Sequence, residues 1–391
     1  YLAMNGVYDP SSPEAASVKV TAKDKKGREV AGTVRFILEQ GAVARVNVAD
    51  VNVWATRIVS PEAFFDNGMP KDATLEYSTD GVRWESAGAP VKISSDKAVY
   101  ATIDGLEPGT GYCFRVVSAG QVISKGDYSI VTEQAAQLGN SGMESWTTQL
   151  HHYKTKGLIS DNNETRDWYR PWASEDEAWW DVNSKKTLAT YTSQQYAEYK
   201  VVPTVSYSSD AAEGSCSAQL ASTFICNMAS DVDDGIGGAG NLGGSITGMG
   251  VEYAKAAGEM FIGTSSEDGS HASEGHSFTS RPSSLSFKYK YDSYDNDVFK
   301  VTVRVEDASG NVIASKEMSD GRASSGWASM TIELDYSVLD RKAARIYVCF
   351  RSSSLADEDI TYRKTKVTIA GTTKNGYIGS VLKVDDLQLN Y

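Results

Sequence analysis

The chain has 391 residues and a formal net charge of −13, with 51 acidic against 38 basic side chains. Its length allows two well-buried domains, and its negative charge argues against a phosphate-backbone partner such as nucleic acid. No apolar run approaches the roughly 20 residues of a transmembrane helix. The chain begins YLAMNGVYDP, without an initiator Met or signal peptide, so we expect a trimmed, mature product.

Short alternating runs recur between turn residues along the whole sequence, and long amphipathic helices are absent. This pattern predicts an all-β chain with an N-terminal immunoglobulin- or fibronectin-like β-sandwich, followed by a larger β-sandwich of the jelly-roll type. We place the boundary in the small and polar residues of EQAAQLGNSG. The predicted domains are therefore residues 1–135, a spacer module, and residues 136–391, a carbohydrate-binding jelly roll.

The first module begins with a polar stretch, residues 1 to about 16, that we expect to form a tether. Further on, LEYSTDGVRW predicts a hairpin with Asp80-Gly81 at its tip. Tyr112 stands where a tyrosine corner belongs, and Phe114 and Val116 alternate with it into a core. Such modules usually space and orient a partner domain, so we assign this one no chemistry.

Five of the eight tryptophans lie between Glu144 and Asn183, among charged residues and without helical or strand periodicity. We predict a loop that stacks indole rings on the flat face of a sugar and binds the sugar hydroxyls with polar groups. In the alternative, the indoles only plug the open end of the sandwich. The predicted carbohydrate-binding residues are Trp168, Trp172, Glu177, Trp179, Trp180, Asp181 and Asn183, with Tyr291 and Arg351 as wall residues.

Regular strands fill the last third of the chain. Leu285, Phe287, Tyr289 and Tyr291 share one face, and later runs repeat the alternation. In the closing VLKVDDLQLNY the apolar phase changes at Asp385-Asp386, which predicts a β-bulge.

The order of the motifs ESWTT, WWDVN, GSCSAQL, AGEMFIG, FTSRPSSLSFKYKY, CFRSSS and GSVLKVDDLQLNY resembles the carbohydrate-metabolism domain family, over roughly residues 138 to 391. The resemblance implies a jelly roll similar to those of carbohydrate-active enzymes and binding modules. It also implies a bacterial protein of the cell surface, as an outer-membrane lipoprotein, or of the periplasm. Its N-terminal lipid anchor would have been removed from this chain, and other surface glycan-utilisation proteins would be its neighbours. The resemblance implies no proven reaction.

Three functions stay open from the sequence. We favour non-catalytic binding of a poly- or oligosaccharide in surface carbohydrate utilisation. A glycoside hydrolase or lyase using the loop carboxylates is the second hypothesis, with no catalytic residue assigned. A structural or adhesive surface protein without a sugar site is the third.

Cofactors are not expected from the sequence. Residues 238 to 243 spell GxGxxG, but no buried strand precedes them, so we expect a loop rather than a nucleotide site. A structural calcium ion between Glu144 and the Asp385-Asp386 pair is the one metal hypothesis. Its alternative, rim acids paired with basic residues, is favoured.

Overall fold

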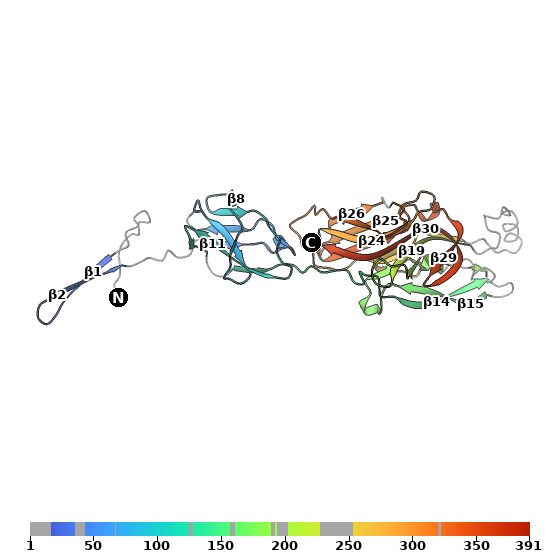
Figure 1. Ribbon diagram of the computed structural model, residues 1–391, viewed down its shortest axis with the longest axis horizontal. Helices are drawn as coiled ribbons and strands as arrows, with labels where there is room; N and C mark the ends of the chain where they lie inside the picture. The colour runs from blue at the N-terminus through green and yellow to red at the C-terminus, as the bar shows by residue number, and fades with distance from the viewer. Residues whose placement is uncertain are drawn as a thin grey trace. The chain divides into compact units, whose positions relative to one another are not determined.

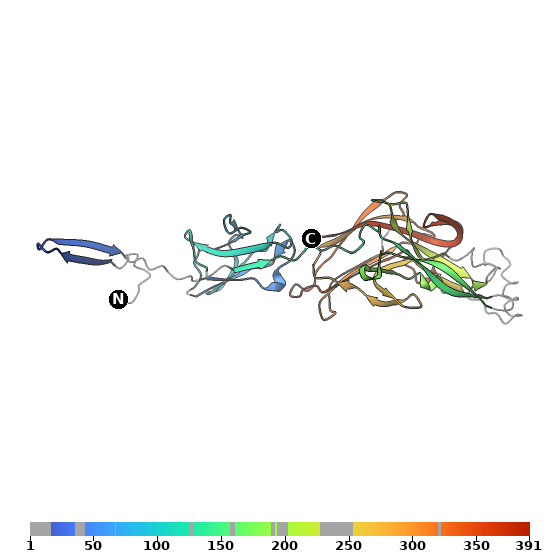
Figure 2. The ribbon, with the colours of Figure 1, turned by 90° about the horizontal axis from the view of Figure 1, so that it is seen from below.

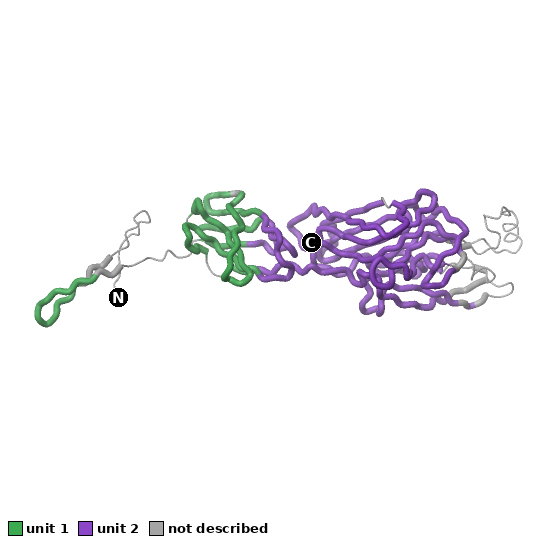
Figure 3. The backbone as a smooth tube through the Cα atoms, viewed as in Figure 1, with its two compact units in different colours: residues 1–47, 60–101, 112–129 green, residues 48–59, 102–111, 130–391 purple. Residues whose placement is uncertain are grey.

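The fold is known from a computed structural model that describes residues 17–35, 44–66, 68–124, 128–156, 161–188, 192–193, 202–226, 253–319 and 322–391. The described chain is nearly all β-strand, as predicted (Figures 1 and 2). It divides into two compact units, with residues 1–47, 60–101 and 112–129 in the smaller and residues 48–59, 102–111 and 130–391 in the larger (Figure 3). The predicted GxGxxG loop lies outside the described residues.

The smaller unit contains two antiparallel β-sheets. One antiparallel sheet has the order β3-β5-β9-β8, and the other has the order β12-β11-β6-β7, with β13 paired to β11. The strands are β3 (Ala44–Asn47), β5 (Glu62–Phe65), β6 (Thr74–Ser78), β7 (Glu85–Ser86), β8 (Pro90–Ile93), β9 (Lys97–Tyr100), β11 (Gly111–Ser118), β12 (Gln121–Val122) and β13 (Tyr128–Val131). A separate hairpin joins β1 (Ser17–Lys23) to β2 (Glu29–Arg35).

Two predictions for this unit are confirmed. Strands β6 and β7 form the hairpin expected around Asp80-Gly81, and Gly81 has a φ of 69°, a left-handed conformation that glycine adopts without strain. Tyr112, Phe114 and Val116 are buried on one face of β11. The alternation in the sequence therefore identified the core face of this strand correctly.

The larger unit is built on two seven-stranded antiparallel sheets. The first has the order β16-β21-β28-β25-β26, with β22 beside β21 and β23 beside β28. Its strands are β16 (Trp180–Val182), β21 (Glu259–Ser265), β22 (His271–Glu274), β23 (His276–Ser277), β25 (Lys300–Glu306), β26 (Val312–Met318) and β28 (Arg345–Arg351).

The second sheet has the order β18-β19-β30-β24-β27, with β20 beside β19 and β29 beside β30. Its strands are β18 (Val205–Ser208), β19 (Ser217–Cys226), β20 (Tyr253–Ala256), β24 (Ser284–Asp292), β27 (Ala328–Glu333), β29 (Arg363–Ile369) and β30 (Thr372–Asn390).

Smaller elements complete the larger unit. A three-stranded sheet has the order β15-β14-β17. The elements are β4 (Arg57–Ile58), β10 (Ile103–Asp104), β14 (Thr147–Lys156), β15 (Asp161–Arg170), β17 (Thr192–Ser193), the helix α1 (Lys185–Leu188) and the 3₁₀ turns η1 (Asp50–Asn52), η2 (Glu175–Glu177) and η4 (Asp357–Asp359).

The core of the larger unit lies between its two seven-stranded sheets. Strand β24 contributes Leu285, Phe287, Tyr289 and Tyr291, and β25 and β28 contribute alternate residues such as Val303 and Phe350. All of them belong to one continuous cluster of buried side chains. The period-two alternation in the sequence predicted these faces because a strand with one buried side must alternate.

Strand β30 carries the predicted β-bulge. Its pairing with β24 shifts register beside Asp385, and Asp386 has a positive φ of 47°. Leu382 and Val384 before the shift and Leu387 and Leu389 after it are all buried in the same core. One extra residue in the strand therefore turns both apolar runs to the same side.

A buried arginine ties three segments of the larger unit together. The Arg281 side chain is fully buried and pairs with Glu133, from Nη2 to Oε1 at 2.9 Å. Its other N–H groups donate to Glu133 Oε2 and to the carbonyl oxygens of Val51, Val53 and Arg341. All five guanidinium donors are thus used. Burial raises the pKa of Glu133 more than the Arg281 charge lowers it.

Candidate functional site

The tryptophan-rich stretch is not a single loop, contrary to the prediction. Trp168 belongs to strand β15 and Trp180 to strand β16, and only residues 171–179 connect them, through the turn η2. Strand β15 pairs with β14, and β16 pairs with β21. Because β21 comes from a distant part of the sequence, no local periodicity could have revealed that Trp180 lies in a sheet.

Trp180 is part of the core rather than a sugar platform. Its side chain is 0% exposed, and its Nε1 donates to the carbonyl oxygen of Gly139 at 2.7 Å. The ring lies against Phe350, with the two ring centroids 6.2 Å apart. The predicted stacking role is wrong for this residue, because both its ring and its N–H are already occupied inside the protein.

Asp181 is likewise an internal residue. It is 2% exposed, and its Oδ2 accepts hydrogen bonds from the backbone N–H of Ser265 at 2.7 Å and the hydroxyl of Ser265 at 2.9 Å. The same oxygen lies 3.1 Å from Arg170. A carboxylate with these partners holds strands together, so it is not available for a sugar hydroxyl.

Asn183 and Tyr291 are also buried, at 0% and 1% exposed. The Asn183 amide donates to the carbonyl of Ala257 at 2.7 Å, and its oxygen accepts from the hydroxyl of Thr204 at 2.7 Å. The Tyr291 hydroxyl donates to the carbonyl of Ser352 at 3.0 Å. These contacts satisfy buried polar atoms, so the predicted binding roles are wrong for both residues.

Three of the predicted residues come together at one hollow. Trp172, Glu177 and Trp179 line a depression of about 470 Å³. The other lining residues are Gly139, Asn140, Ser145, Ala173, Asp176 and His276. We call this depression the Trp179 hollow. It combines aromatic rings with carboxylates, an amide and a hydroxyl, which is the mixture that small-ligand sites use.

Trp179 is held firmly in the wall of this hollow. The ring of His276 stacks on it, with centroids 4.1 Å apart and planes 16° apart, and Phe278 meets it edge-on at 6.4 Å. A Cβ atom at Gly139 would lie only 2.3 Å from Cδ1 of Trp179. The indole is therefore fixed by contacts on several sides, and its remaining surface is only partly exposed.

Trp172 lines the hollow but has a buried N–H group without a partner among the described residues. The residue is 3% exposed, and within the described part of the chain its Nε1 has no hydrogen-bond partner. Buried polar groups in folded proteins are nearly always hydrogen-bonded to protein, water or ligand. The N–H of Trp172 is thus buried in the wall of the hollow, unpaired within the described ranges, and has almost no surface open to a ligand.

The polar side chains at the rim of the hollow differ in how many hydrogen bonds they already make within the protein. Glu177 and Asp176 are exposed on the turn η2. Asn140 is a structural latch, since its side chain accepts from the backbone N–H of Ser145 and donates to the carbonyls of Ser145 and Pro171. The two carboxylates are therefore the acceptors that stand ready for a ligand.

Trp168 and Arg351, the other two predicted residues, lie outside the Trp179 hollow. Arg170 covers the ring of Trp168, with the guanidinium carbon 4.0 Å from the ring centroid, and the Lys185 ammonium lies 4.8 Å away. Arg351 lines a second depression, of about 460 Å³, on the first seven-stranded sheet. There it pairs with Glu259 at 2.8 Å and with Asp357 at 2.6 Å.

A histidine lies between two carboxylates beside Arg351. His271 places Nδ1 3.0 Å from Glu274 and Nε2 3.4 Å from Glu259. Burial alone would lower the pKa of His271, but the two carboxylates outweigh it and raise the pKa. Burial would raise the pKa of Glu259, and there His271, Lys186 and Arg351 outweigh it and lower the pKa. The cluster therefore favours an ionised His271.

Two carboxylates of the calcium hypothesis, those of Glu144 and Asp385, bind the same loop, residues 212–216. Asp385 accepts from the backbone N–H groups of Ala212 and Glu213, and Glu144 accepts from those of Ser215 and Cys216. Among the described residues no group of three or more His, Cys, Asp or Glu side chains is placed to hold a metal ion. The carboxylates anchor the loop by hydrogen bonds to its backbone.

Sequence reasoning missed two residues that build the Trp179 hollow. His276 was not among the predicted binding residues, and Gly139 was placed only in the segment that marks the domain boundary. No pattern in the sequence connects either of them with Trp179. The close approach of the Trp179 ring, which leaves no room for a Cβ atom, is what requires glycine at position 139.

No family model and no curated protein matches the chain. Among solved structures, it is similar to one described as a carbohydrate-binding module from the β-sandwich superfamily, with 7% identity, 90% of this chain and 100% of the other covered, and a TM-score of 0.25. It is also similar to SGBP-B from a xyloglucan utilisation locus of Bacteroides uniformis, with 7% identity, coverage of 96% and 79%, and a TM-score of 0.23.

A third similar structure is the surface glycan-binding protein PbSGBP-B of Prevotella bryantii, with 9% identity, coverage of 97% and 83%, and a TM-score of 0.22. TM-scores below 0.5 assign neither a function nor a ligand to this chain. Within the described residues, no helix is long and apolar enough to span a membrane.

Proposed function

We propose that the larger unit binds a poly- or oligosaccharide in the Trp179 hollow. The observation that carries the proposal is the pairing of the partly exposed indole of Trp179 with the exposed carboxylates of Asp176 and Glu177 in one depression. A sugar ring offers apolar C–H faces that pack on aromatic rings and hydroxyls that donate to carboxylates.

The exposed carboxylates of the rim support the same ligand class. A sugar hydroxyl both donates and accepts, so it can donate to the carboxylate of Glu177. A purely apolar ligand would cover Asp176 and Glu177 without offering them a hydrogen bond, which is unfavourable. The hollow therefore suits a hydroxyl-rich ligand better than a hydrocarbon.

We infer a setting at the bacterial cell surface or in the periplasm, with a lipid anchor preceding this chain and other glycan-utilisation proteins as neighbours. The motif order that resembles the carbohydrate-metabolism domain family supports this setting. We prefer non-catalytic binding to the activity of a glycoside hydrolase or lyase, since both carboxylates of the hollow are exposed side chains on one short turn. A paired acid and base would need two carboxyl groups on opposite sides of the scissile bond.

The test is a titration of the full chain with a panel of plant and host oligosaccharides by isothermal calorimetry, with released reducing ends measured in parallel. We expect saturable binding without new reducing ends. Trp179→Ala and Glu177→Gln should each weaken binding by about tenfold or more, as central aromatic and polar contacts do. Trp327→Ala is the matched control, since Trp327 is a partly exposed tryptophan that does not line the hollow.

Three results would count against this function. Reducing ends released by the wild type and lost in Glu177→Gln would make the protein a hydrolase. Equal weakening by Trp179→Ala and Trp327→Ala would place the ligand elsewhere. A wild type that binds nothing across the panel, while Trp179→Ala melts at a lower temperature, would leave the tryptophans as a plug of the sandwich.

A further inference from the structure

The smaller unit carries a hollow of its own on the outer side of β11. It has a volume of about 640 Å³ and lies between the loop that joins β6 to β7 and the strands β11 and β12. Its lining includes Thr79, Gly81, Trp84, Cys113, Arg115 and Ser124. We call it the Trp84 hollow. The sequence predicted only a spacing role for this unit, and such a role does not require a depression of this size.

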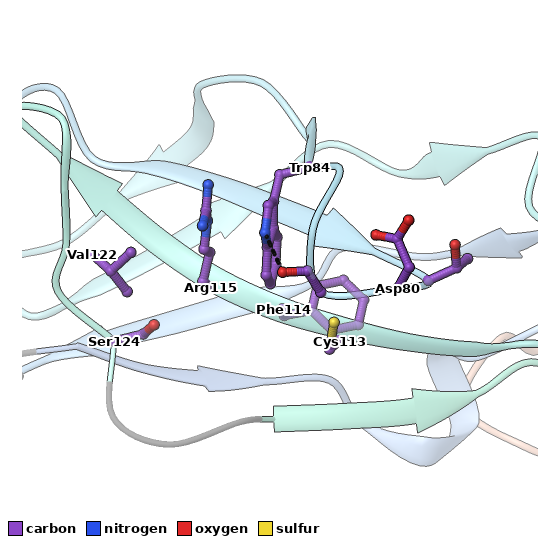
Figure 4. A pocket seen from close by; sticks show the side chains of 9 residues that line it. Asp80, Trp84, Cys113, Phe114, Arg115, Val122 and Ser124 are labelled. Carbon is purple, nitrogen blue, oxygen red and sulfur yellow. Dashed lines mark hydrogen bonds between the residues drawn. The ribbon is translucent and has the colours of Figure 1, made fainter.

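Trp84 is a rigid aromatic wall in this hollow (Figure 4). Its Nε1 donates to the carbonyl oxygen of Gly81 at 3.0 Å, and the guanidinium carbon of Arg115 lies 4.1 Å from its ring centroid. Arg115 is itself fixed by Glu76 at 2.7 Å. A ring held at its edge and on one face loses little conformational entropy when a ligand packs against it.

There is room for a ligand beside the ring. Figure 4 shows Arg115 on one side of the indole and Asp80 and Cys113 on the other. A Cβ atom added to Gly81 would meet no atom within 4 Å. Trp84 is only partly buried, whereas Phe114, the next residue along from Cys113 on β11, is 2% exposed. The indole therefore presents surface that core packing does not consume.

The charges around the hollow are already paired. Arg115 pairs with Glu76, and Arg83 pairs with Asp80 at 3.1 Å. The carboxylate of Asp80 also accepts from the backbone N–H groups of Val82 and Arg83, and its pKa is lowered by these bonds. An ionic ligand would have to compete with these partners. An uncharged ligand can use the indole surface and the hydroxyls of the rim without breaking an ion pair.

We propose that the Trp84 hollow is a second, independent sugar-binding subsite for a neutral glycan. A pyranose ring has the apolar face that the indole can pack against and the hydroxyls that suit Thr79 and Ser124 at the rim. This inference rests on the proposed function, because it takes the same glycan as the ligand. Two sites on one chain would bind a polymer more tightly than either site alone.

The experiment compares full-length wild type, Trp84→Ala and Trp179→Ala in calorimetric titrations with one neutral oligosaccharide that the wild type binds. We expect two sites per chain for the wild type and one for each variant. Retention on the matching polysaccharide should fall about tenfold or more for Trp84→Ala through the loss of avidity. Val82→Ala is the matched control, since Val82 is 80% exposed in the same loop and does not line the hollow.

A second variant separates loss of the site from loss of folding. Thr79→Trp adds bulk at an exposed rim position and leaves Trp84 in place, so it should also reduce the stoichiometry to one. If Trp84→Ala and Thr79→Trp fold and keep wild-type stoichiometry and retention, the subsite is refuted while the Trp179 hollow stands. The subsite is also refuted if a proline-rich peptide, and no sugar, binds in a Trp84-dependent way. A wild type that binds no glycan refutes both sites together.

Discussion

Replacing Gly139 by alanine should displace Trp179 and distort the hollow that we propose as the glycan site. A Cβ atom at this position would lie 2.3 Å from Cδ1 and 2.5 Å from Cγ of Trp179, far inside normal contact distance. The backbone cannot easily retreat, because the carbonyl of Gly139 accepts the buried N–H of Trp180 at 2.7 Å. The indole must therefore move against its stacked partner, His276.

The expected loss of stability follows from these contacts. Forcing an extra methyl group into packed surroundings costs about 1–3 kcal/mol. Alanine also restricts the unfolded chain, which offsets about 0.4–1 kcal/mol. We therefore expect Gly139→Ala to lower the free energy of unfolding by about 1–2 kcal/mol. Glycan affinity should fall as well, since Trp179 moves.

Urea denaturation followed by circular dichroism measures the first effect, as a lower midpoint at an unchanged m-value. Gly142→Ala is the matched control in the same segment, because its Cβ would approach no atom closer than 3.9 Å, at Glu144 Cγ. If Gly139→Ala and Gly142→Ala have equal midpoints and both bind glycan like the wild type, the view that Gly139 fixes Trp179 is wrong.

Three further predictions concern the stability of the larger unit. Arg281→Met should lower the free energy of unfolding by about 3–5 kcal/mol because it leaves Glu133 buried without its partner. Adding Glu133→Leu should restore most of that loss. Urea denaturation measures both variants, and a double variant that is as unstable as Arg281→Met alone would contradict the prediction. His271 has a raised pKa, so the ionised side chain stabilises the fold fully below about pH 6, and this stabilisation is lost as the pH rises through the folded-state pKa. The melting temperature should therefore fall over that pH range. It should fall less in His271→Gln. Burial opposes ionisation of Asp210, but Lys383 and Lys290 outweigh it and lower its pKa to about 2. Ionised Asp210 therefore stabilises the fold above about pH 4, and this stabilisation is lost as the pH falls toward 2. In an acid titration, Asp210→Asn should lack the part of the stability loss that comes from protonation of Asp210.

The sequence determined the strand faces of this protein because burial on one side of a strand imposes a period of two. Leu285, Phe287, Tyr289 and Tyr291 were placed in a core by that rule, and they lie in it. The change of phase at Asp385-Asp386 likewise predicted the bulge in β30. Each of these inferences needs only neighbours along one strand.

The roles of the tryptophans were decided by the tertiary structure alone. Trp179 and Trp180 are adjacent in the sequence, yet one lines a hollow and the other is fully buried. The difference arises because β16 pairs with the distant β21, which turns Trp180 toward Phe350 and leaves Trp179 to stack on His276. Composition can show that aromatic and acidic side chains gather in one stretch of chain. Only long-range strand pairing decides which of them reach the surface.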